Sequence, residues 1–219
     1  MARIAEDLLL LLLDNPDEQP HVDRAPLGRA LAGALILDLA FDCRVRPTLP
    51  DEPLPAGHLT ALAGPVPVDP AVRPTWTVLQ QQPLTPADAL AAIRKHAEDD
   101  VLDQLLRTGQ IHQIQLTAHR LRRNHYRWPV KNRSRVAVAR SELLGVLFEQ
   151  RRPNPVTAAL TCLLHGVHGL EAVLSLNDTG ARVVDERARE IADGGWVDGS
   201  ETAQVNLSLT LAQVLPALG

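Results

Sequence analysis

The fold is decided by the segment LGRALAGALILDLAF, which spans residues 27–41. Leucine recurs every four residues along it, at positions 27, 31, 35 and 39, and small Ala and Gly residues fill many of the places between. This spacing aligns apolar side chains on a helix, and the small residues let neighbouring helices approach closely. The preceding Pro26 suits the first turn of a helix. The segment therefore predicts a central helix, Leu27–Phe41, packed tightly against others.

Two further apolar segments extend this core. Arg3–Leu13 contains six consecutive leucines and predicts a short helix buried on most sides, and Val156–Leu174 predicts a second long apolar helix. Aromatic residues make up only 3% of the chain, so Leu, Ala and Val must build the core. We therefore expect a mostly α protein of one domain, residues 1–219, built around central apolar helices with one protruding β-hairpin.

Shorter elements are expected around this core. The segment 46–86 holds ten prolines in 41 residues, which predicts a mostly irregular connector with a short helix near His58–Ala63. Thr85 and Pro86 have the pattern of an N-cap followed by a helical first residue, and Ser141 is expected to cap another helix. The remaining predicted helices are 86–95, Asp99–Arg107, Glu142–Gln150, Arg182–Ala192 and Leu207–Leu218.

Charge is segregated along the chain. From His119 to Arg140 there is no acidic residue, and there are eight basic ones: Arg120, Arg122, Arg123, Arg127, Lys131, Arg133, Arg135 and Arg140. Removing those eight from the 22 Lys and Arg leaves 14 basic residues against 26 acidic ones, a net charge of −12. A concentrated basic segment on an acidic body indicates a docking surface for an anionic partner.

The basic segment coincides with a predicted hairpin. Ile111, Ile114 and Leu116 mix with polar residues in a short strand-like stretch, and Tyr126–Val130 is the expected partner strand. Tyr126 and Trp128 lie within the basic segment, where aromatic side chains can sit at the level of lipid headgroups.

The sequence carries no pattern of a membrane span or an export signal. Residues 8–13 are six leucines, whereas a span needs about 20 apolar residues. Glu6 and Asp7 precede them in place of the basic residues of a signal peptide. Cys43 and Cys162 are expected to be free thiols, and His165 and His168 to be packed histidines. No cofactor is expected, and any membrane would be met from the cytosol.

An enzymatic alternative comes from an acidic helix start. Asp99-Asp100-Val101-Leu102-Asp103 resembles the metal-binding motif of class I terpene synthases, in which carboxylates hold Mg²⁺ ions on a prenyl diphosphate. A second motif of those enzymes is approached by three residues of this chain: Asn177, Asp178 and Asp185. The competing interpretation is that these acids merely favour a helix N-terminus.

A third interpretation is a nucleic-acid-binding wing. A helix ending near Gly109 and followed by a basic hairpin with interleaved aromatics has the outline of a winged helix. The helix that would enter the groove begins with Asp99 and Asp100, whose charge is wrong for that task. The charge of this helix therefore argues against a nucleic-acid partner.

Four stretches together resemble the Golgi phosphoprotein 3 family, in its actinobacterial branch. They are residues 4–13 (IAEDLLLLLL), 27–40 (LGRALAGALILDLA), 159–171 (ALTCLLHGVHGLE) and 187–196 (RAREIADGGW). The resemblance implies a helical domain with a protruding hairpin, membrane association through a phosphoinositide headgroup, and self-association through the hairpin. The tryptophan and arginine of the eukaryotic headgroup site align with Asp23 and Ala32, and their later arginine pair falls near Lys95 and Glu98.

These observations give one functional hypothesis. We expect a non-catalytic, cytoplasmic protein, peripheral on the inner membrane face, that binds anionic phospholipid and forms a homo-oligomer through the hairpin. If half of the eight basic residues reach the membrane, they contribute roughly 4 kcal/mol, which makes a weak and reversible contact. The candidate headgroup-binding residues are Lys95, Arg120, Arg122, Arg123, Arg127, Trp128, Lys131, Arg133 and Arg135.

Overall fold

The computed structural model describes residues 3–115, 126–174, 176–197 and 199–219. In these ranges the chain forms ten α-helices and two short antiparallel strand pairs, so the prediction of a mostly helical fold is confirmed. The helices are α1 (Ile4–Leu13), α2 (Arg24–Phe41), α3 (Arg73–Gln81), α4 (Pro86–Ile93), α5 (Ala97–Arg107), α6 (Arg133–Phe148), α7 (Pro155–Gly166), α8 (Leu170–Leu174), α9 (Asp178–Ala192) and α10 (Thr202–Val214). The strands are β1 (Val45–Pro47), β2 (Leu59–Ala61), β3 (Ile114–Gln115) and β4 (Tyr126–Arg127), and two 3₁₀ turns cover Pro70–Val72 and Leu215–Ala217.

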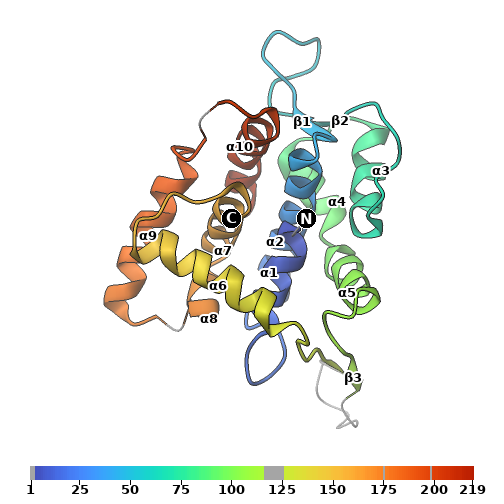
Figure 1. The fold of residues 1–219 in the computed structure, drawn as a ribbon. Helices are drawn as coiled ribbons and strands as arrows, with labels where there is room; N and C mark the ends of the chain where they lie inside the picture. Colours follow the sequence, from blue (N-terminus) through green and yellow to red (C-terminus); the bar gives the residue numbers. More distant parts are fainter. Residues whose placement is uncertain (1–2, 116–125, 175, 198) are drawn as a thin grey trace.

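The centre of the molecule is formed by α1, α2 and α7. Every residue of α1 is buried, and α2 is buried along most of its length, as the leucine spacing predicted. In Figure 1 the other helices lie around these three, with α3, α4 and α5 on one side and α9 on the other. Gly33 shows how close the packing is, because a Cβ atom there would lie 3.1 Å from Leu163 and 3.2 Å from Val214.

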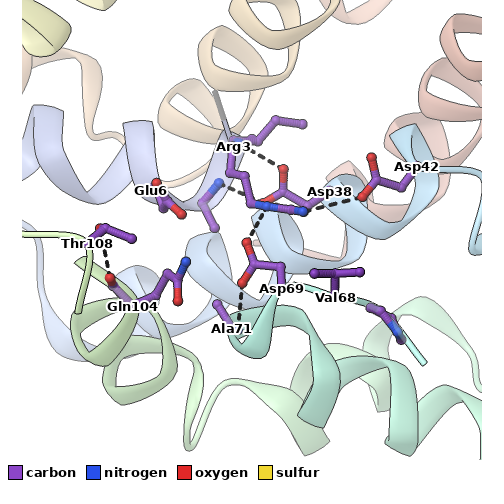
Figure 2. Close-up of polar contacts among 12 residues, drawn as sticks. Arg3, Glu6, Asp38, Asp42, Val68, Asp69, Ala71, Gln104 and Thr108 are labelled. Carbon is purple, nitrogen blue, oxygen red and sulfur yellow. Dashed lines mark hydrogen bonds and ion pairs between the residues drawn. The ribbon is translucent and has the colours of Figure 1, made fainter. Parts of the chain in front are cut away.

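A buried carboxylate from α2 caps α1. The backbone N–H groups of Ile4 and Ala5 donate to the two carboxylate oxygens of Asp38, at 2.8 and 3.1 Å. Figure 2 shows Arg3 beside this cap, where its guanidinium pairs with Asp42 and Asp69. Asp38 therefore satisfies two helix-terminal donors that α1 has no residue of its own to bond.

Stability is expected to depend on pH through Asp38. Burial raises the pKa of this carboxyl from 3.8 to about 7, despite the two backbone hydrogen bonds. Between those values the folded chain holds more protons than the unfolded chain, so the free energy of unfolding falls as pH rises, by about 1.4 kcal/mol for each pKa unit. Asp38→Asn removes this contribution. The free energy of unfolding is measured with urea at pH 5 and at pH 7.5. We expect it to fall more between these two pH values for the unsubstituted protein than for Asp38→Asn. Equal losses in the two proteins would contradict the assignment.

The proline-rich segment is more ordered than the sequence predicted. β1 pairs with β2 in register Val45↔Ala61, and Leu59 forms a further bridge with Leu84. The expected helix near His58–Ala63 is therefore wrong, because the backbone there bonds to neighbouring strands. A 3₁₀ turn then leads into α3, which the sequence analysis did not predict.

Helix bounds differ from prediction at several places, including the starts of α9 and α10, and two of the differences are large. The expected helix Glu142–Gln150 is the second half of α6, which begins at Arg133 because the Asn132 side chain accepts from the backbone N–H of Arg135. The expected helix Val156–Leu174 is interrupted after α7. His168 adopts a left-handed conformation there, with φ of 54°, and Gly169 donates to the carbonyl of Leu164, closing the helix end.

Within the described residues no helix is long and apolar enough to span a lipid bilayer.

Candidate functional site

The predicted hairpin is present. β3 and β4 pair in register Ile114↔Arg127 and Gln115↔Tyr126, and a bridge between Ile111 and Val130 continues the ladder. In Figure 1 the hairpin projects from one end of the molecule, beyond α5.

The base of the hairpin is anchored to two neighbouring segments. The backbone N–H of Trp128 donates to the carbonyl of Glu18 at 3.0 Å, in the loop that follows α1. Lys131 donates in the same way to Gln110 at 2.8 Å, directly after α5. These bonds hold the base against the helical body, so the side chains that it carries have defined positions.

Five basic side chains gather at this base, and we call them the hairpin-base surface: Arg107, His112, Arg127, Lys131 and Arg133. All five are exposed, and none forms an ion pair in the part of the chain that the structure describes. The basic segment predicted three of them. It missed Arg107 and His112. Arg107 joins because α5 ends beside Lys131, and the backbone N–H of His112 donates to the carbonyl of Pro129 at the base of the hairpin.

Two arginines of the basic segment form ion pairs with acidic residues in or next to α1. Arg135 is paired through Nη1 with Glu6 at 2.7 Å and through Nε with Asp7 at 2.6 Å, and Arg140 is paired with Asp14 at 2.7 Å. Burial raises the pKa of Asp7, although Arg135 acts in the opposite direction. Arg135 therefore neutralises buried acids of α1 and is not part of the hairpin-base surface.

The aromatic residues of the hairpin have different environments. Trp128 is half-buried and packs against the core, with its ring centroid 5.9 Å from that of Tyr126. Tyr126 and Ile114 are 39% and 49% exposed. Three predicted headgroup-binding residues lie outside the described residues: Arg120, Arg122 and Arg123.

Lys95 is exposed but does not join this surface. It lies in the turn between α4 and α5, whereas Lys131 lies beyond the far end of α5. Eleven residues of helix place the two about 16 Å apart or more. Around Lys95 the charges are mixed, since Arg24 interacts with Glu98, whose pKa is raised by burial.

The residues of the proposed Mg²⁺ site are not brought together. Asp99, Asp100 and Asp103 lie on α5, and Figure 1 shows α5 and α9 on opposite sides of the molecule. Asn177 caps α9 by accepting from the N–H of Gly180 at 2.8 Å, and Asp185 accepts from His165 and Arg189. Asp178 begins α9. Among the described residues no group of three acidic, His or Cys side chains is placed to hold a metal ion.

Cys162 and His165 have structural roles. Burial raises the pKa of the Cys162 thiol to about 12, which leaves it protonated and unreactive at neutral pH. His165 joins α7 to α9 through a 2.6 Å bond to Asp185.

Comparison with known proteins identifies the family of this chain. No curated protein matched the chain in a sequence search. The family model of Golgi phosphoprotein 3 (GPP34) matches residues 4–206, which include the four stretches that first indicated the resemblance. The chain therefore belongs to the Golgi phosphoprotein 3 (GPP34) family.

Proposed function

We propose that this protein associates peripherally with membranes and binds anionic phospholipid headgroups through the hairpin-base surface. The observation that carries the proposal is the group of exposed cations at an anchored position, without carboxylate partners among the described residues. Family membership supports it, because the resemblance of this chain to that family implies association with membranes through phosphoinositide headgroups. On this proposal the protein acts without catalysis, on the inner, cytoplasmic face of the membrane.

The expected affinity is low for one copy. Each Lys or Arg near an anionic leaflet contributes about 1 kcal/mol, so Arg127, Lys131 and Arg133 together contribute roughly 3 kcal/mol. A contact of this strength is reversible and weakens with salt. The cations of the hairpin-base surface are exposed side chains, so we propose recognition of negative charge with little selectivity among headgroups.

Vesicle sedimentation tests this proposal. The protein is mixed at low salt with vesicles of neutral phosphatidylcholine, with or without an anionic phospholipid, and the pelleted fraction is measured. We expect pelleting with anionic vesicles only, and its loss as salt is raised. Equal pelleting with the two kinds of vesicle would reject headgroup binding, and binding that persists in high salt would reject the electrostatic mechanism.

We further propose that the protein self-associates through the hairpin, which would strengthen a weak membrane contact by avidity. Support comes from Ile114 and Tyr126, two large side chains that remain exposed on the paired strands. Ile114→Asp with Tyr126→Asp is expected to shift the protein to monomer in analytical ultracentrifugation, because charges at such a contact repel. Leu209→Asp, at a similarly exposed position on α10, is the control and should leave the mass unchanged. Equal masses for the hairpin variant and the unsubstituted protein would contradict the hairpin contact.

A further inference from the structure

The outer side of α6 carries exposed apolar side chains. The helix packs its inner side on α1, α7 and α9. On the outer side, six exposed residues lie within about 120° of the helix circumference, and we call them the α6 outer face: Ser134, Ala137, Val138, Ser141, Leu144 and Phe148. The three large side chains, Val138, Leu144 and Phe148, are 65%, 39% and 44% exposed. Single exposed apolar residues are common on proteins, but several on one face of one helix indicate a contact surface.

The α6 outer face adjoins the hairpin-base surface. β4 ends at Arg127, and α6 begins six residues later at Arg133, which belongs to the hairpin-base surface. Figure 1 shows α6 across the front of the molecule, with the hairpin beyond its first turn. The cations proposed to meet phospholipid headgroups therefore continue directly into an exposed apolar helix face.

Basic residues lie at both ends of the α6 outer face. Lys131 and Arg133 are exposed at the start of the helix, and Arg151 and Arg152 are exposed just after its end. The Nη2 group of Arg151 donates to the carbonyl of Ser141 at 3.3 Å, which places this guanidinium beside the outer face.

The acidic residues near this face are fewer than the basic ones. Glu149 is exposed after the last turn of α6, but it is paired with Arg151 at 3.1 Å. Glu142 is half-buried and lies about 100° around the helix from Ser141, at the edge of the face. The surroundings of the α6 outer face are therefore positive, which is complementary to an anionic surface.

We propose that α6 lies along the membrane surface, with its outer face buried at the boundary between headgroups and acyl chains. This inference rests on the membrane binding proposed above and gives that contact an orientation. An apolar helix face flanked by Lys and Arg is typical of helices that lie in the membrane interface. The 16 residues of α6 extend about 24 Å along the surface, and the cations at both ends contact headgroups.

A second copy of the chain is a less suitable occupant of this face. If two α6 helices packed on one another through their outer faces, basic ends would meet basic ends whether the helices ran parallel or antiparallel. Such contacts between like charges oppose association, whereas an anionic bilayer is attracted to all four cations.

Vesicle affinity tests the proposal on the full chain, with vesicles of phosphatidylcholine and phosphatidylglycerol. We expect Leu144→Ser with Phe148→Ser to bind about tenfold more weakly than the unsubstituted protein. Leu54→Ser with Leu209→Ser is the matched control, because these leucines are 42% and 47% exposed on other elements, and it should bind as the unsubstituted protein does. The affinity of each protein falls as salt is raised, but the tenfold ratio should remain, since salt screens charges and not apolar contacts.

A fluorescent label gives a second measurement that does not depend on removing apolar side chains. Ser141→Cys, in a Cys43→Ser background, is labelled with a polarity-sensitive fluorophore, while Cys162 stays buried. We expect its emission to shift to shorter wavelength on anionic vesicles, and the same label at Leu209→Cys to show no shift. Circular dichroism checks that each variant is folded.

The two proposals can fail separately. If the unsubstituted protein binds anionic vesicles, but the α6 variant binds as tightly as its control or the label at position 141 shows no shift, the orientation is overturned and headgroup binding by the hairpin base stands. If the unsubstituted protein does not bind anionic vesicles, both proposals are rejected. A lower mass of the α6 variant in ultracentrifugation without vesicles, together with unchanged vesicle affinity, would assign the face to a second copy and overturn the membrane contact.

Discussion

Replacing Arg135 by Ala is expected to lower the free energy of unfolding by about 3–5 kcal/mol. The substitution leaves Glu6 and Asp7 without their cation, and these carboxylates are only 7% and 5% exposed. A buried charge without a partner is among the most costly defects in a folded chain, and a loss of this size is a large share of a typical domain's stability. Urea unfolding followed by circular dichroism measures it.

Two further variants keep this prediction testable if Arg135→Ala does not fold. Arg133→Ala removes the same kind of side chain two residues away. Because that side chain is exposed and forms no ion pair with any residue that the structure describes, its effect should stay within about 0.5 kcal/mol. Replacing the whole cluster, with Glu6→Gln, Asp7→Asn and Arg135→Met, should recover most of the lost stability, since no charge then remains buried. Arg135→Ala as stable as Arg133→Ala would show that the ion pairs do not stabilise the fold.

The parts of the fold that could be predicted are those with a local pattern. The four-residue leucine spacing of 27–41 depends on helix geometry alone, and it gave α2 correctly. The hairpin was predictable because Ile111 and Ile114 mix with polar residues in a short strand-like stretch and the partner segment Tyr126–Val130 is rich in strand formers. In both cases the information lies within a few neighbouring residues.

The parts that failed depend on distant or unusual backbone contacts. β1 and β2 are three residues each and lie among prolines, so only their pairing with one another and with Leu84 identifies them as strands. The interruption after α7 requires a histidine, His168, in a conformation that is most often taken by glycine. The first half of α6 is rich in Arg and Ser, and its apolar pattern is too weak to reveal a helix.

The candidate site could likewise be predicted only in part. The excess of positive charge was visible in the sequence, but its distribution between free and paired arginines was not. Arg135 meets Glu6 and Asp7 across about 128 positions of sequence, a contact that only the packing of α6 on α1 creates. A signal was nevertheless present, because two acids in an otherwise apolar helix that must be buried need a cation nearby.

The second large effect is expected on membrane binding. Arg127→Ala, Lys131→Ala and Arg133→Ala together remove three exposed cations from the hairpin-base surface, at about 1 kcal/mol each near an anionic leaflet. The apparent affinity for anionic vesicles at low salt should therefore fall about 100-fold. Stability should change little, because none of the three forms an ion pair among the described residues.

Sedimentation of this triple variant beside a charge-matched control tests the central claim most directly. The control carries Arg24→Ala, Arg94→Ala and Arg182→Ala, which change the net charge equally at exposed positions on other elements. We predict that the control pellets with anionic vesicles nearly as well as the unsubstituted protein, while the hairpin-base variant stays in the supernatant. Equal losses would assign the attraction to net charge alone, and a larger loss in the control would place the contact near Lys95; either result would contradict the hairpin-base surface.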